Sequence, residues 1–409
     1  MSGRELRFVT HGPINERTAG EGGTGSVSAA QLFVAFLRLG LTAFGGPAMV
    51  AYIRDLAVKK KRWLTPEAFQ GGAALCQSIP GATAMQTAAY VGLCANGPVG
   101  AVAAFVGFGL PAFAFMVILS VAYQAGHDLQ PVMSVFHGLQ VMVVALIVNA
   151  MINFGRASIK NWRDLFPAAG ATALLMLRVS PILAIVAAAA SGLVLYRGVN
   201  IPEPKEAPPL KHKRGRLIRF PVYIGAILAG GLAALFVLNE ALFALATVML
   251  KVDLFAFGGG FTSVPLMLHE VVDVRHWLDT RTFMDGIAMG QVTPGPIVIT
   301  ATFVGFQIAG LFGAVVGTIA VFSPSLLIML ATAPHLHQLQ KSALFRRCLR
   351  AVFASFCGLL LGVAIDFGLA VSWNFLAIVI ALAAFVALRL RVDILWVVLA
   401  GALISVFVL

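Results

Sequence analysis

The stretch Gln77-Ser78-Ile79-Pro80-Gly81-Ala82-Thr83 decides the fold of this chain, together with a second copy, Gln291-Val292-Thr293-Pro294-Gly295-Pro296. Each Pro-Gly pair lies mid-way through about thirty weakly polar residues that otherwise follow a helical pattern. Because proline removes a backbone donor and glycine accepts unusual backbone angles, we expect a helix to break at both places. Breaks at membrane depth occur only where they are buried in protein or line a cavity. Matching breaks in two halves of a chain therefore predict a transporter's binding site.

The composition predicts an all-α polytopic membrane protein. Of the 409 residues, 59% are hydrophobic and 11% are charged, and the mean hydropathy is +0.92. Several apolar runs approach the ~20 residues that cross a bilayer. The net charge of +12 is confined to a few short loops, which is typical of the positive-inside rule and not of nucleic-acid binding. Four cysteines without CxxC spacing, and His335 and His337 without an acidic or cysteine partner, predict neither a metal nor a cofactor site.

The chain divides into two repeats. The predicted parts are a polar cytoplasmic tail at 1–26, a first repeat at 27–198, a basic Pro-rich cytoplasmic linker at 199–219, a connecting transmembrane helix at 220–238 and a second repeat at 239–409. Apolar segments predict helices at 27–46, 67–95, 98–123, 131–153, 163–178 and 180–197, and after the connecting helix at 240–257, 282–309, 311–332, 346–366, 373–389 and 392–409. The segments at 67–95 and 282–309 are the ones broken by Pro-Gly.

An internal duplication relates the two halves. Residues recur at offsets of 213 or 214, as in Phe44-Gly45-Gly46 with Phe257-Gly258-Gly259, Trp63-Leu64 with Trp277-Leu278, Gln77 with Gln291, Pro80-Gly81 with Pro294-Gly295, Gly100-Ala101 with Gly313-Ala314, and Pro111 with Pro324. Even the expected helix starts agree, because Thr65 and Asp279 are both good N-cap residues at equivalent positions. Such agreement over some 70 residues predicts two copies of one fold.

The loop charges predict that the second copy is inverted in the membrane. Basic loops at 59–62 and 156–163 alternate with a loop near 127 that is not basic. The pattern swaps in the second half, where the loop at 335–350 is basic, the loop at 270–279 is mixed and the loop near 366 is not basic. Two alternatives remain open. If 27–46 and 67–95 each cross once, loop 59–62 faces outward; if each turns back at its break, every basic loop is cytoplasmic. We favour the re-entrant alternative, and both place the N-terminus in the cytoplasm and the C-terminus outside.

Two cations are candidates for binding an anion. Arg38 and Lys251 each lie six residues before a Phe-Gly-Gly, 213 residues apart, within apolar segments. A cation there costs at least ~2.5 kcal/mol on insertion scales, which points to a functional partner. The competing interpretation is that both reach the headgroups or pair with a carboxylate such as Asp253 or Glu240. We favour the functional role, since both copies keep a positive charge.

The Pro-Gly breaks, like the two cations, predict a site that binds an anion. A half-helix starts after each Pro-Gly, and its first amides, free of intrahelical partners, attract anions together with the helix dipole. The candidate ligands are Arg38, Lys251, Gly45, Gly46, Gly258, Gly259, Gln77, Ser78, Pro80, Gly81, Thr83, Gln291, Thr293, Pro294, Gly295 and Thr300. Close packing of helices is the alternative role for any single glycine. Asp253 and Asp366 are the candidate proton carriers.

These motifs resemble the chromate ion transporter (CHR) family in its two-domain form. The resemblance rests on Phe44-Gly45-Gly46-Pro47, the Pro-Gly-Ala-Thr-Ala run at 80–84, Pro294-Gly295-Pro296 and the steps ending in Leu110-Pro111 and Ser323-Pro324. It covers about residues 28–198 and 238–409. The resemblance implies export of chromate across the bacterial inner membrane, with sulfate as a related substrate. Ala82 departs from the pattern, because Pro-Gly-Pro stands in the second copy only.

Three functional hypotheses follow. The first is a secondary carrier that exports chromate and confers chromate resistance, and the second is a carrier of the same build that imports sulfate or another oxyanion. The third, a membrane-embedded enzyme, would need a nucleophile–base pair, a metal cluster or a nucleotide motif, and the sequence shows none. We therefore expect a transporter and not an enzyme. The expected partners are the anion and the lipid bilayer; the oligomeric state, a homodimer included, stays open.

Overall fold

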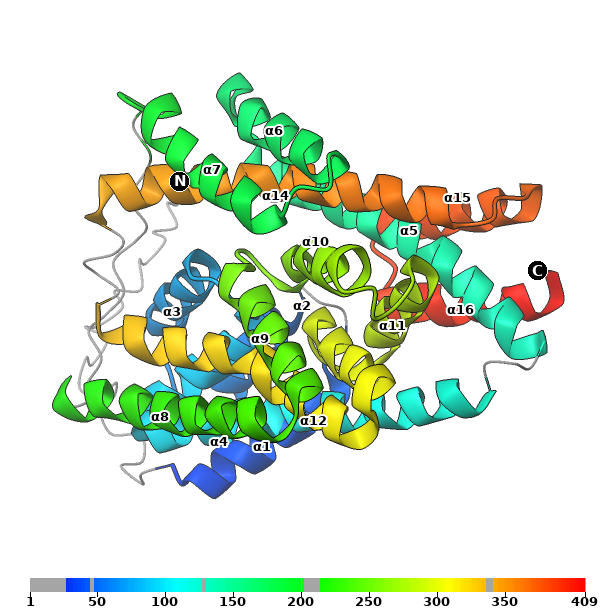
Figure 1. Cartoon of the computed structure of the whole chain (residues 1–409). Coiled ribbons are helices and arrows are strands. Elements are labelled where there is room, and N and C mark those ends of the chain that lie inside the picture. The colour runs from blue at the N-terminus through cyan, green and yellow to red at the C-terminus, as the bar shows by residue number, and fades with distance from the viewer. Residues whose placement is uncertain are drawn as a thin grey trace, which may run out of the picture.

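The chain is mainly helical in the part that the computed structural model describes, residues 27–44, 48–126, 130–199, 201, 214–335 and 341–408 (Figure 1). Gly45 and Gly46, the tail and most of the linker lie outside these residues. The first repeat holds α1 (Ala29–Thr42), α2 (Ala48–Arg54), the π-helical η2 (Asp55–Lys60), α3 (Pro66–Ser78), α4 (Thr83–Gly126), α5 (Gln130–Ser158), η3 (Trp162–Asp164), α6 (Leu165–Met176) and α7 (Pro181–Leu195). Helix α8 (Arg214–Leu238) connects it to the second repeat.

The second repeat follows the same order of elements. It holds α9 (Glu240–Phe255), η4 (Gly260–Thr262), α10 (Ser263–Leu268), the π-helical η5 (His269–Val274), α11 (Thr280–Val292), η6 (Ile297–Ile299), α12 (Thr300–Thr332), η7 (Ala333–His335), α14 (Ala343–Ala370), α15 (Phe375–Arg389) and α16 (Ile394–Val408). Five helices within the described ranges are long and apolar enough to cross a bilayer, namely 83–126, 133–158, 219–238, 297–335 and 343–370.

The two repeats share their unusual backbone conformations. Left-handed residues stand at equivalent positions: Gly81 with Gly295, Gly97 with Gly310, Arg62 with His276, and Arg178 with Arg391. The expected N-caps are confirmed, since the Thr65 side chain accepts from the amide of Ala68 and the Asp279 side chain from that of Thr282. The duplication seen in the residues is therefore also a duplication of the backbone, as two repeats of one broken-helix fold require.

Each Pro-Gly break is the tip of a helical hairpin. A side chain on Gly72 of α3 would overlap the ring of Tyr90 in α4, and one on Gly286 of α11 would overlap Phe303 of α12. Because Gly72 lies before the first break and Tyr90 after it, the chain must turn back on itself between them. This is the geometry of the re-entrant alternative.

Helices α4 and α12 each fold back a second time. Asn96 and Gly97 leave the helical conformation in α4, and Ala309 and Gly310 do so in α12. The arms on either side of the turn pack so closely that a side chain on Gly92 would overlap the carbonyl of Gly100. Each element is thus a short arm from the break followed by a longer apolar arm, and only the longer arm has the length of a membrane span.

The repeats interlock through their last helices. Helices α6 and α7 of the first repeat pack on α14 of the second, and α15 and α16 of the second pack on α5 of the first (Figure 1). Helix α8 contacts mainly α9 and α12, and none of its apolar window is buried. This exposure suits a connecting helix that faces lipid.

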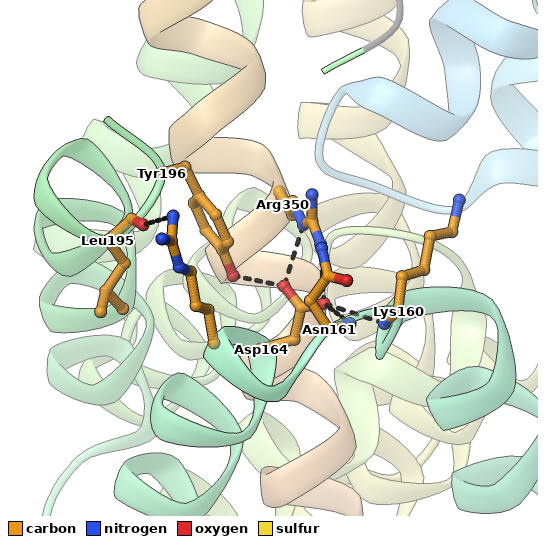
Figure 2. Close-up of polar contacts among 7 residues, drawn as sticks. Lys160, Asn161, Asp164, Leu195, Tyr196 and Arg350 are labelled. Atoms are coloured by element: carbon orange, nitrogen blue, oxygen red, sulfur yellow. Dashed lines mark hydrogen bonds and ion pairs between the residues drawn. The ribbon is translucent and has the colours of Figure 1, made fainter. Parts of the chain in front are cut away.

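A buried ion pair fixes the start of α6 to α14 (Figure 2). Arg350 of α14 donates to both carboxylate oxygens of Asp164 at 2.9 Å, and the hydroxyl of Tyr196 donates to the same carboxylate at 2.5 Å. The amides of Lys160 and Asn161 complete the set at 2.8 Å each. Burial alone would raise the pKa of Asp164, yet these hydrogen bonds, that from Arg350 first, hold the pKa well below its ordinary value.

Candidate anion-binding site

Each Pro-Gly break is bound to the other repeat at the residue that precedes Phe-Gly-Gly. The amide of Gly81 donates to the carbonyl of Ala256 at 2.7 Å, and the amide of Gly295 donates to that of Ala43 at 3.1 Å. Ala43 and Ala256 are themselves equivalent, 213 residues apart. The Pro-Gly motif of each repeat therefore contacts the residue before the Phe-Gly-Gly motif of the other repeat.

The segment from Phe257 to Gly260 lies between the two breaks. Phe257 forms an isolated antiparallel bridge with Pro80, and a side chain on Gly260 would run into Ile297, two residues after Gly295. Both breaks thus converge on one short segment.

One glycine of this segment, Gly259, leaves its backbone open to the surroundings. Gly258 and Gly259 have φ of +87° and +126°, which side chains rarely adopt. A side chain on Gly259 would meet no heavy atom within 4 Å. The backbone beside the breaks is therefore accessible for close approach by a small ligand.

The hydroxyls near the breaks differ in what they can still donate. Those of Ser78, Thr293 and Thr300 donate locally, to carbonyls three or four residues earlier at 2.7, 3.0 and 2.8 Å. The hydroxyl of Thr83 is buried, and no group in the described part of the chain bonds to it. One free hydroxyl therefore stands at the first break.

The two predicted glutamines also differ. Gln77 is exposed, whereas Gln291 is buried and its amide nitrogen has no hydrogen-bond partner among the described residues. A buried donor without an acceptor is rare in folded proteins and costs about 1–3 kcal/mol. Thr83 at the first break and Gln291 at the second thus each offer an unsatisfied side-chain donor.

The two predicted cations lie on exposed helix faces. Arg38 is exposed on α1, and the side chain of Lys251 on α9 is 47% exposed. The ammonium of Lys251 lies 3.5 Å from the carboxylate of Glu270 on η5, and not beside Asp253 or Glu240. The convergence of Arg38 and Lys251 on one ligand stays a prediction.

The two candidate proton carriers have different surroundings. Asp366 of α14 pairs with Arg178 at 3.3 Å, and Arg178 also bonds to Asp273 at 2.8 Å. Asp253 is fully buried and accepts from the amide and the hydroxyl of Ser325, both at 2.7 Å. Asp366 is therefore held in an ion-pair network, whereas Asp253 lies next to the first break.

Comparison with known proteins supports the division of the chain into two repeats. The family model for chromate transporters matches residues 30–193 and 243–406, once in each repeat. The chain belongs to the chromate transporter family. An uncharacterized transporter of Methanocaldococcus jannaschii is 41% identical over 93% of this chain and 95% of its own length. A chromate transport protein of Cupriavidus metallidurans is 31% identical over 82% and 81%, and a probable one of Synechococcus elongatus 30% over 83% and 85%. No solved structure matches the chain.

In this member of the chromate transporter family, sequence reasoning missed three polar residues around the breaks. Ser325 binds Asp253, and Glu270 binds Lys251. Asp285 of α11 is buried and accepts from the hydroxyl of Tyr123 at 3.0 Å and the amide of Gln140 at 2.8 Å. The duplication drew attention to polar residues kept in both copies. Asp285 and Ser325 stand opposite Gly71 and Ala112, so only a search for residues peculiar to one copy would have found them.

Proposed function

We propose that this chromate transporter family member is a secondary carrier that exports chromate, a tetrahedral dianion, across the plasma membrane. The observation that carries the proposal is the pair of unsatisfied buried side chains, Thr83 and Gln291, one at each Pro-Gly break. Chromate offers four oxygens that accept hydrogen bonds. An anion between the breaks would supply the missing acceptor to both side chains.

The backbone around the breaks supports an anion as the ligand. Helix α4 begins at Thr83 and the helical run of η6 and α12 begins at Ile297, so two helix starts meet the converging segment. Their first amides and the positive ends of their dipoles favour negative charge. Gly259 adds backbone that a ligand can approach, whereas a side chain on Gly258 would meet the rings of Phe154 and Phe353 at 3.1 Å. Gly45 and Gly46 are proposed to add approachable backbone in the first repeat. Arg38 and Lys251 would supply attraction over a longer range.

The direction follows from the charge of the ligand. The interior of a cell is electrically negative, and moving one charge through that potential is worth ~2.3 kcal/mol per 100 mV. A dianion therefore leaves downhill by about twice that amount, whereas its import needs coupled cations. We accordingly propose export as the physiological direction, with the N-terminus in the cytoplasm and the C-terminus outside.

Transport in everted membrane vesicles tests the proposal. Vesicles that contain the protein should accumulate labelled chromate when the potential is positive inside, and unlabelled sulfate should compete if it is a related substrate. Replacement of the unsatisfied donor in Gln291→Leu should lower the initial rate at least tenfold. The control is Gln70→Leu, the same change at an exposed position of α3. Uptake no faster than in vesicles without the protein would contradict the proposal, and uptake only with an inward cation gradient would favour the import hypothesis.

A further inference from the structure

Asp253 is a buried carboxylate, and one of its two oxygens has no hydrogen-bond partner among the described residues. It lies in the last turn of α9, three residues before Ala256, and its side chain is 0% exposed. Oxygen Oδ2 accepts the amide and the hydroxyl of Ser325. Oxygen Oδ1 is buried, and no described group bonds to it.

One hydroxyl links this carboxylate to the first break. Ser325 Oγ, which donates to Asp253, accepts the amide of Ala82 at 2.7 Å. Ser325 Oγ also lies where a side chain on Gly81 would be. The side-chain amide of Gln86 donates to the carbonyl of Pro80 at 2.6 Å. Asp253 is therefore part of the wall of the first break.

No cation compensates Asp253 within the described residues. The elements packed on α9 are mainly α8, α10 and α12. Helices α10 and α12 carry no charged residue, and the charged residues of α8 are Arg214, Arg216 and Arg219, all in its first six residues. Next to α10 in sequence, η5 carries His269, Glu270 and Asp273, and Lys251 on α9 itself is turned to Glu270. A buried carboxylate with no opposite charge is strongly disfavoured in its ionised form. A bound proton would remove that charge.

The second break has no carboxylate at the position equivalent to Asp253. The residues equivalent to Asp253, Ser325 and Ala82 are Gly40, Ala112 and Pro296, which lack a carboxylate, a hydroxyl and an amide hydrogen. The geometry of the two breaks is alike, with φ of +121° at Gly81 and +127° at Gly295. The chemistry of the two half-sites is thus different, because Asp253 is bonded to the first break through Ser325 and the second break has no carboxylate at the equivalent position.

We infer that Asp253 is a proton-binding site coupled to the anion, so that one proton is bound whenever the anion occupies the breaks. The inference rests on the proposed function. A dianion beside the first break repels an ionised Asp253, so anion and proton each favour binding of the other. The loaded carrier then moves a net charge of −1 instead of −2. The membrane potential still drives exit, with half the force that acts on the free dianion.

Chromate binding by the purified full-length protein, measured against pH above neutrality, tests the assignment. Chromate stays doubly charged in this range, so its own titration does not interfere. Once Asp253 ionises, the affinity of the wild type should fall tenfold for each further pH unit. Asp253→Asn keeps the volume and an acceptor for Ser325 but carries no charge, so its affinity should stay level. Ser325→Ala, which removes one donor to the ionised carboxylate, should move the fall to higher pH and serves if the Asn variant does not fold.

Further variants separate Asp253 from the remaining carboxylates and from a sodium site. Asp393→Asn, the same change at the exposed residue that caps α16, should keep the tenfold slope. A level affinity in the wild type, a slope that persists in Asp253→Asn, or a slope that disappears in Asp285→Asn would overturn the assignment. A chromate affinity that changes when choline replaces sodium at constant pH would also overturn the assignment. A wild type that binds no chromate at any pH would instead refute the proposed function.

Discussion

At the residue scale, the two breaks share a backbone but not a set of side chains. Gly81 and Gly295 are left-handed at φ near +120°, where a residue with a side chain is strained, so both copies need glycine. The residue after the glycine differs: Ala82 keeps an amide hydrogen, and that hydrogen is bonded to Ser325. The departure from Pro-Gly-Pro in the first copy therefore has a physical reason, since proline at 82 would leave Ser325 without this donor.

The pairing of Lys251 with Glu270 gives a test of whether the lysine binds the anion. If it does, Lys251→Met should lower chromate transport at least tenfold, and the double variant Lys251→Met, Glu270→Gln should be as poor. If the pair is structural, the damage comes from an orphaned charge on Glu270, and neutralising both partners should restore transport. Initial rates in everted vesicles distinguish the two outcomes.

The two substitutions of Arg38 give a second test. Arg38→Lys should lower the rate of chromate transport less than Arg38→Ala does, because lysine keeps the positive charge but lacks the planar guanidinium that binds an oxyanion through two hydrogen bonds.

At the element scale, the sequence predicts the broken helices well and their packing poorly. Pro80-Gly81 and its copy mark the hairpin tips because local chemistry at those residues forbids a continuous helix. The N-caps Thr65 and Asp279 are local signals too. By contrast, the packing of α6 and α7 on α14 of the other repeat joins apolar helices of similar composition, and nothing in such a pattern selects the partner. The same limit hid the contact between Gly81 and Ala256, which depends on how the two repeats cross.

The bond between Asp164 and Arg350 should be a main anchor of the α6–α7 hairpin on α14. Asp164→Asn leaves Arg350 largely buried without its counter-charge, so we expect a loss of roughly 3 kcal/mol or more in folding stability. Because the folded pKa of Asp164 lies below its ordinary value of about 4, the contribution is complete above that pH and declines as the pH falls below it. Melting temperatures in detergent at neutral and acid pH measure both effects.

The control for this anchor is an exposed ion pair. Asp55 lies 2.9 Å from Lys59, with side chains 48% and 67% exposed, so Asp55→Asn should change the melting temperature little. An Asp164→Asn protein that melts with the wild type at neutral pH would show that apolar packing alone holds the hairpin to α14. A difference between wild type and variant that does not shrink in acid would show that the ionised carboxylate is not its source.

At the scale of the whole molecule, inversion is what brings the two breaks together. If the two copies are related by an in-plane two-fold axis, as we expect, their hairpins enter from opposite sides of the membrane and their tips meet inside it. The hairpins also suggest an explanation of the charge pattern: if the chain turns back at each break within the membrane, we expect Lys59 to Arg62 on the cytoplasmic side with the other basic loops. The equivalent loop of the second repeat, at 273–276, then lies outside.

Labelling of equivalent loop residues tests both the inversion and the hairpins. Lys61 and Arg275 are exposed and 214 residues apart. In intact cells a membrane-impermeant maleimide should react with Arg275→Cys and not with Lys61→Cys, which should react only after the membrane is opened. The four native cysteines are buried or half-buried, and the unsubstituted protein measures their background. Reaction of both variants from the same side would refute the inversion. Reaction of Lys61→Cys from outside would show that 27–46 and 67–95 each cross the membrane, because only a re-entrant pair returns the loop between them to the cytoplasm.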